Sequence, residues 1–129
     1  MAIERDVVEA AGAPAAVGPY SHAIRAGELL FCSGQIPLDP SSGRLVGQAP
    51  GEQCAQCLRN LAAVCEAAGT DLGRAIRLTV YTTDLDRFDQ INEAYATFFE
   101  ADPPARVAVG VPALPKGALV EISGIVALP

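Results

Sequence analysis

Residues 51–82 read GEQCAQCLRNLAAVCEAAGTDLGRAIRLTVYT, and they contain the clearest secondary-structure pattern in the chain. Apolar residues recur at helical spacing over 51–68 and form one face: Cys54, Cys57, Leu58, Leu61, Ala62, Cys65 and Ala68. Gly69 predicts the end of this helix, because glycine readily adopts the left-handed conformation found there. Residues 74–82 alternate and are rich in β-branched residues, so they predict a strand.

Three short strands are expected before this helix, at residues 3–8, 22–26 and 28–35. Gly27 and Glu28 suit a tight hairpin turn between the second and the third strand. After the 74–82 strand, the sequence predicts a second helix and then two more strands.

The second helix is expected at roughly 87–100, with Asp86 as its N-cap and Pro103 and Pro104 as its stop. Its predicted apolar face consists of Phe88, Ile91, Tyr95, Phe98 and Phe99. Residues 105–111 and 119–127 predict the final strands, which look antiparallel across the connection that joins them.

The predicted element order is β-β-β-α-β-α-β-β. Strands separated by single helices imply crossover connections, so we expect an α+β fold in a single domain over residues 1–129. Its mixed sheet would carry both helices on one face. The other face is then uncovered, and its apolar positions predict self-association.

Composition narrows the possible functions. The formal net charge of −6 disfavours nucleic-acid binding, because phosphates need a basic surface. The N-terminus lacks the basic start and apolar run of a signal peptide, and no stretch approaches the ~20 apolar residues of a membrane helix. We expect a cytoplasmic protein without membrane contact, with its four cysteines as free thiols.

Two features favour structural roles. Cys54 and Cys57 have the C-x-x-C spacing, but they lie on the predicted apolar face without a second such pair. A core role is therefore expected for them, rather than a metal or redox site. His22 is the only histidine, so a typical zinc site is not expected, and no phosphate-binding glycine motif occurs.

Five segments together resemble one family. In chain order they are AVGPYSHA (16–23), SGQIPLDP (33–40), NEAY (92–95), PARV (104–107) and LPKGALVEI (114–122). With them, the chain resembles the RidA family, also called YjgF, over residues 6–127. The resemblance implies a chorismate-mutase-like fold and a homotrimer with clefts between subunits. It also implies a cofactor-free enzyme that hydrolyses 2-iminopropanoate and 2-iminobutanoate to 2-oxo acids and ammonia.

The resemblance assigns the central roles to Arg106 and Glu121. Arg106 matches the clamp for the substrate carboxylate, which a guanidinium can bind through two hydrogen bonds; a surface salt bridge is the alternative. Glu121 matches the residue that orients the attacking water, with a solvated strand carboxylate as the alternative. A symmetric 112–118 connection would place Glu121 opposite Ala108 and on the face of Arg106, whereas a one-residue slip would separate them.

Four further residues match the family's pocket. Tyr20 would donate its hydroxyl over the substrate, Ser33 would bond the carboxylate or the imine nitrogen, and the backbone N–H of Gly34 would assist. Asn92 would hold Tyr20 or the attacking water. Without the resemblance, these residues also fit ordinary structural roles.

Three positions depart from the family. Many relatives carry Ser where this chain has Val107, Cys or Thr at Ala108, and an acidic residue at Gly110. A polar group beside Arg106 is therefore missing, which leaves substrate preference and rate open. The alternative hypothesis is a trimer that binds 2-oxo acids, or acts in regulation or as a chaperone, without turnover. Ribonuclease activity, attributed to some relatives, is disfavoured by the acidic charge.

Overall fold

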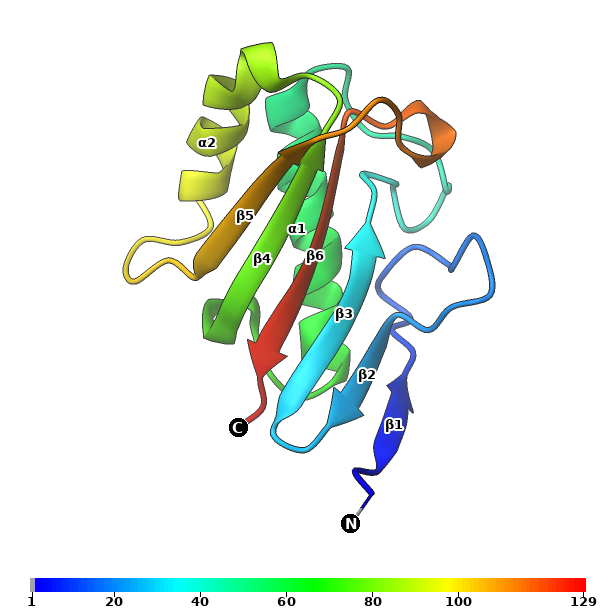
Figure 1. Ribbon diagram of the computed structural model, residues 1–129. Helices are drawn as coiled ribbons and strands as arrows, with labels where there is room; N and C mark the ends of the chain where they lie inside the picture. The colour runs from blue at the N-terminus through cyan, green and yellow to red at the C-terminus, as the bar shows by residue number, and fades with distance from the viewer. Residues whose placement is uncertain (1) are drawn as a thin grey trace.

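The computed structural model describes residues 2–129, so Met1 of the expected 1–129 domain lies outside the described part. The described residues follow the expected order β-β-β-α-β-α-β-β (Figure 1). The elements are β1 Arg5–Val8, β2 Ala23–Ala26, β3 Leu29–Gln35, α1 Pro50–Ala67, β4 Ala75–Thr82, α2 Phe88–Ala96, β5 Ala105–Gly110 and β6 Val120–Ala127. The predicted α+β class is confirmed.

The strands form a mixed sheet in the spatial order β1-β2-β3-β6-β4-β5. β4 and β5 are parallel, and the other neighbouring strands are antiparallel. α2 lies in the crossover from β4 to β5, as parallel neighbours require. β6 then returns between β3 and β4, so β5 and β6 are not neighbours and the expected pairing of the last two strands is wrong.

α1 supplies the centre of the core and lies behind the sheet in the view of Figure 1. Its Cys54, Cys57, Leu58, Leu61 and Cys65 are buried, as the apolar spacing predicts. They pack against the sheet residues Leu78, Val80, Val120 and Ile122. α2 adds Ile91 and Tyr95 to the same core, so the expected packing of both helices on one face is confirmed.

The second helix is shorter than expected. Leu85–Arg87 form a 3₁₀ helix that contains Asp86, and the N-cap of α2 is Arg87, so the prediction of Asp86 as N-cap is wrong. α2 ends at Ala96, well before Pro103, so the predicted proline stop is wrong. At this end the Thr97 hydroxyl donates to the Ala94 carbonyl at 2.7 Å. The next N–H groups bond three residues back, which tightens the chain into a 3₁₀-type turn.

No helix within residues 2–129 covers the opposite face of the sheet. Phe31, Val107 and Val109 lie on this open face and are 43%, 43% and 37% exposed. Large apolar side chains exposed on an uncovered sheet face favour contact with another surface, so self-association remains our expectation. None of the helices in the described part is long and apolar enough to cross a membrane.

Candidate active site

Four of the six expected site residues line one cavity of about 270 Å³: Tyr20, Ser33, Gly34 and Glu121. Val17, Ile36 and Pro115 complete its lining. The wall therefore combines the loop before β2, the end of β3 and the start of β6. We call this cavity the Glu121 pocket.

Gly34 lies against the carboxylate of Glu121. The pairing of β3 with β6 shifts register between Cys32 and Gln35, so Ser33 and Gly34 lie in an irregular stretch that redirects the chain. A Cβ at position 34 would overlap the Glu121 carboxylate. Glycine is therefore needed for the carboxylate to occupy this position.

The hydroxyls of Tyr20 and Ser33 offer different groups to a ligand. The Tyr20 oxygen accepts the backbone N–H of Val17 at 3.2 Å, so its own proton is free to be donated. The Ser33 hydroxyl donates to the Ser21 carbonyl at 2.6 Å. Ser33 therefore offers a ligand its lone pairs, which suit the N–H of an imine better than a carboxylate.

Glu121 is half-buried on β6. Burial raises the pKa of Glu121 above the usual range of a glutamate, because desolvation disfavours the charged form. Its carboxylate is consequently a stronger base than a solvated one, as a group that takes a proton from water requires.

Arg106 lies in a second cavity of about 380 Å³, between α2 and the start of β5, which we call the Arg106 pocket. Its Nη1 donates to Asn92 Oδ1 at 2.8 Å. Its Cζ lies 5.2 Å and 5.0 Å from the ring centroids of Phe88 and Tyr95. Asn92 thus contacts Arg106, and the predicted contact with Tyr20 is not formed.

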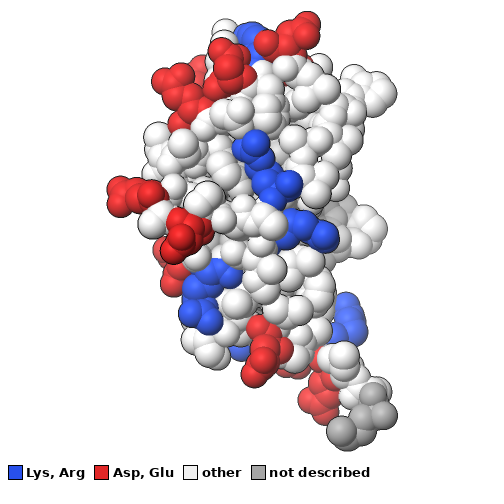
Figure 2. Space-filling view, turned by 60° about the vertical axis from the view of Figure 1, so that its left-hand side comes forward, with Lys and Arg blue, Asp and Glu red and all other residues white. Residues whose placement is uncertain are grey.

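The Arg106 pocket favours an anion, because Arg106 is the charged residue in its lining. Figure 2 shows several basic side chains near the middle of the face that carries α2 and β5, with acidic side chains beside and around them. No Asp or Glu of the described residues lies within salt-bridge distance of Arg106. The guanidinium is therefore not neutralised by the chain itself.

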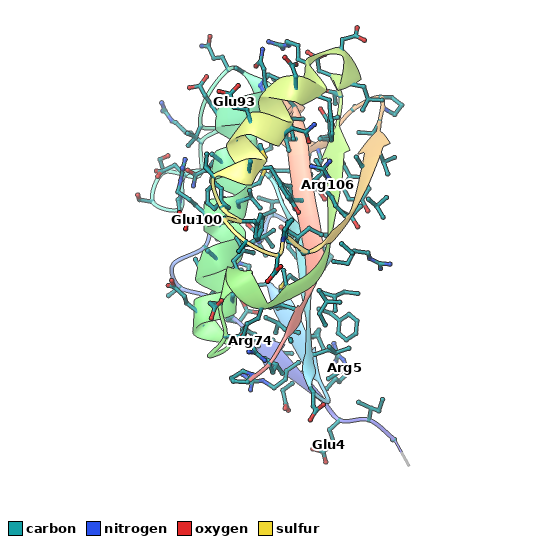
Figure 3. The ribbon with its side chains drawn as sticks, turned by 90° about the vertical axis from the view of Figure 1, so that its left-hand side faces the viewer. Glu4, Arg5, Arg74, Glu93, Glu100 and Arg106 are labelled. Carbon is teal, nitrogen blue, oxygen red and sulfur yellow. The ribbon has the colours of Figure 1, made fainter. Side chains whose placement is uncertain are left out.

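The strand register separates Arg106 from Glu121. Arg106 pairs with Leu78, whose side chain is buried beneath the helices, whereas Glu121 pairs with Tyr81, three positions along β4. Side chains three positions apart on a strand point to opposite faces. Figure 3 shows Arg106 on the side of the sheet that carries α2. The symmetric arrangement, which would give a shared face, is therefore not formed, because Ala108 shares its row with Ile122 and not with Glu121; the alternative of opposite faces holds.

Comparison with known proteins identifies the family. The family described as endoribonuclease L-PSP matches residues 10–128. The chain belongs to this family, which is the RidA family of the sequence motifs. The predicted resemblance is thus confirmed.

Three relatives illustrate the similarity. The mouse 2-iminobutanoate/2-iminopropanoate deaminase is 44% identical over 123 residues, which cover 95% of this chain and 91% of the relative. RidA from an Antarctic Psychrobacter is 39% identical with a TM-score of 0.92, covering 95% of this chain and 99% of that one. E. coli TdcF with bound serine is 38% identical with a TM-score of 0.91, covering 96% and 99%.

The three departures from the RidA pattern lie at different places. Ala108 is two residues from Arg106 on the same face of β5, so a methyl group and no polar side chain lies beside the guanidinium at this position. Val107 points to the open face. A Cβ at Gly110 would overlap the Leu85 side chain, so an acidic residue there would require Leu85 to move.

His22 and the cysteines of this RidA-family chain have structural positions. His22 is 4% exposed; its Nδ1 accepts the Ala10 N–H at 2.9 Å and its Nε2 donates to the Pro14 carbonyl at 2.8 Å. It therefore fixes the loop that leads to Tyr20. All four cysteines are free and buried, and no cluster of three or more His, Cys, Asp or Glu side chains suited to a metal occurs within residues 2–129.

Sequence reasoning missed three buried amides on α1 that bond to the loop after β3 and to the residue before β6, next to the Glu121 pocket. Asn60 donates to the carbonyls of Ile36 and Leu38 at 3.2 Å and 3.0 Å. Gln56 donates to the Leu38 carbonyl at 3.3 Å and to Asn60 Oδ1 at 2.9 Å. The third amide, Gln53, accepts the N–H of Leu119 at 2.7 Å and donates to the Gly47 carbonyl at 3.1 Å. Amides at helical spacing beside an apolar face were the available signal.

Proposed function

We propose that this chain hydrolyses 2-imino acids such as 2-iminopropanoate and 2-iminobutanoate to 2-oxo acids and ammonia, without a cofactor. One observation carries the proposal: the chain presents a guanidinium without a carboxylate partner and a half-buried carboxylate with a raised pKa, each at a cavity. The deaminase named for these substrates, 44% identical in mouse, supports it. Serine bound to TdcF supports a site for a small molecule with a carboxylate.

The site would be shared between copies of the chain. Arg106 and Glu121 lie on opposite faces of the sheet, so one small substrate cannot contact both within one copy. A homotrimer that brings the Arg106 pocket of one subunit to the Glu121 pocket of the next would complete the site. The exposed Phe31, Val107 and Val109 on the open face supply the apolar surface for such an assembly.

In the proposed reaction Arg106 binds the substrate carboxylate through two N–H groups. Glu121 removes a proton from water while the water oxygen attacks the imine carbon. The resulting tetrahedral adduct carries a hydroxyl and an amino group. Glu121 passes the proton taken from water to the nitrogen, which completes this amino group. It then takes the hydroxyl proton and passes it to the same nitrogen, so the C–N bond breaks, the C=O bond forms, and ammonia and the 2-oxo acid leave. Ser33 accepts the imine N–H, and Tyr20 donates its free hydroxyl proton to the substrate.

A binding-only trimer is the second candidate, because Ala108, two positions from Arg106 on the same face of β5, is apolar and offers no hydrogen bond to a substrate. A regulatory or chaperone-like protein of this kind would bind 2-oxo acids saturably but would not accelerate release of ammonia. The two candidates therefore differ in turnover, not in the need for Arg106.

The test is the decay of 2-iminopropanoate, generated in place by an amino-acid oxidase, with and without the protein. Faster decay that is lost in Arg106→Ala and in Glu121→Gln is expected. Arg44→Ala, which removes an exposed arginine elsewhere, is the matched control. No acceleration by the folded wild type, together with saturable pyruvate binding, would replace the enzyme with the binding-only protein.

A further inference from the structure

The guanidinium of Arg106 is more restrained than its strand position requires. All residues of β5, an edge strand, are exposed, and a long exposed side chain ordinarily samples many rotamers. Three side chains nevertheless restrain this guanidinium. Asn92 accepts from Nη1 at 2.8 Å, and the rings of Phe88 and Tyr95 lie 5.2 Å and 5.0 Å from Cζ.

These three contacts come from one face of α2. Phe88, Asn92 and Tyr95 follow one another at spacings of four and three residues, which aligns them along a helix. Tyr95 is only 6% exposed, and its ring centroid lies 4.9 Å from that of Phe99. Phe88 packs against the main core. Both rings are therefore held in place by the residues packed behind them, and they can restrain the guanidinium of Arg106.

An aromatic support leaves the arginine able to bind an anion. A carboxylate partner would neutralise the guanidinium and occupy the N–H groups that a substrate carboxylate needs. An aromatic ring attracts the cation through its π face and takes up none of these donors. Asn92 uses one of the five donors of Arg106. The positive charge and the other donors therefore remain usable.

We propose that Phe88 and Tyr95 are positioning residues, which hold Arg106 in the orientation that binds the substrate carboxylate. This inference rests on the proposed imine hydrolysis. Tyr95 acts through its ring, because its hydroxyl is buried and has no hydrogen-bond partner among residues 2–129. Loss of either ring would let the guanidinium move, which weakens carboxylate binding in the ground state and the transition state alike.

The experiment compares ring removal with ring retention. Phe88→Leu is expected to raise the KM for 2-iminopropanoate and the Kd for pyruvate about three- to tenfold, with kcat changed by less than about twofold. Phe88→Tyr, which keeps a ring, should return both constants toward the wild-type values. Tyr95→Leu and Tyr95→Phe form a second pair with the same expected contrast, and thermal unfolding confirms that each variant is folded.

Phe98→Leu is the matched control, because Phe98 packs against the same core but is not one of the two rings beside Arg106. A purely structural role of Phe88 would lower Tm and the active fraction while KM and the pyruvate Kd stay unchanged, and this result would overturn the proposal. Arg106→Ala separates the two proposals. If it still binds pyruvate and turns over, the clamp itself has failed; if it loses both while Phe88→Leu behaves as wild type, only the positioning role has failed.

Discussion

Arg106 and Glu121 occupy rows three positions apart on β4 and therefore point to opposite faces of the same sheet. The proposed reaction needs the guanidinium of Arg106 and the carboxylate of Glu121 at one substrate. In a single copy of the chain, however, these two groups lie on different surfaces. Any site that uses both must be assembled from two copies, which makes the arrangement testable by mixing.

Arg106→Ala and Glu121→Gln should each be inactive alone but active when mixed. After joint unfolding and refolding, random trimers would contain intact sites made of one wild-type arginine and one wild-type glutamate. About a quarter of the wild-type rate is expected, because each of the two groups is intact in about half of the positions. Each variant refolded alone is the control. A mixture that forms mixed oligomers yet stays inactive would rule out the shared site.

Glu121→Gln should stabilise the protein near neutral pH. The folded-state pKa of Glu121 is raised by burial, so the stabilising contribution of this group is fully present below the unfolded value of about 4.3 and is lost as pH rises through the folded value. The variant should therefore have a higher Tm than the wild type at pH 7, and the difference should vanish below about pH 4. Scanning calorimetry against pH measures this, with exposed Glu66→Gln as control. A lower Tm of Glu121→Gln at pH 7 would contradict the prediction.

Gly34→Ala should damage catalysis more than folding. Its Cβ would overlap the Glu121 carboxylate and displace it, and a displacement of about 1 Å in an active site can cost about 100-fold in rate. Steady-state kinetics and Tm are compared with those of Gly12→Ala, whose added Cβ would meet Ala63 at an ordinary 3.7 Å. Wild-type kcat in folded Gly34→Ala would show that the carboxylate position is not critical.

Asn60→Ala should destabilise the fold by about 2–3 kcal/mol, because it leaves the carbonyls of Ile36 and Leu38 and the Gln56 amide without this partner in the interior. Urea unfolding at constant m-value measures the loss. Glu66→Ala, on an exposed position of the same helix, is the control and should change stability by less than about 0.5 kcal/mol. A similarly small change for Asn60→Ala would remove the structural role of the amide.

The order of elements could be predicted because α1 and the strands carry clear periodicities of burial. The position of β6 could not be predicted in the same way. Its connection from β5 is equally compatible with a hairpin between β5 and β6, so the sequence does not distinguish the two arrangements. Packing places β6 between β3 and β4. Its side chains Val120, Ile122 and Val126 are buried beneath the helices, and a strand can be buried along its whole length in this way when it lies in the middle of the sheet. The position of β6 therefore depends on the packing of the whole sheet, and not on its local sequence.

The motifs predict that Tyr20, Ser33, Gly34 and Glu121 belong to one site. In the structure all four line the same cavity. The separation of Arg106 from this group depends on the registers of β5 and β6 against β4, which lies between them, and the motifs do not fix these registers. The supporting amides Gln53, Gln56 and Asn60 were missed for another reason. Their burial follows from hydrogen bonds to a loop, and apolar spacing along the helix carries no information about such bonds.

The amides of Gln53, Gln56 and Asn60 fix the loop between β3 and α1 to the helix, so that this loop is held in place like a segment of the core. Residues 36–47 have little regular structure. The backbone carbonyls of Ile36, Leu38 and Gly47 nevertheless accept hydrogen bonds from amide side chains of α1. Ile36 lines the Glu121 pocket, so this part of the pocket wall cannot move away without breaking its bond to α1, and the loop and the helix form one cooperative unit. During folding the wall would take shape only after α1 has docked on the sheet. In the native state, slow hydrogen exchange should extend from the helix into this loop.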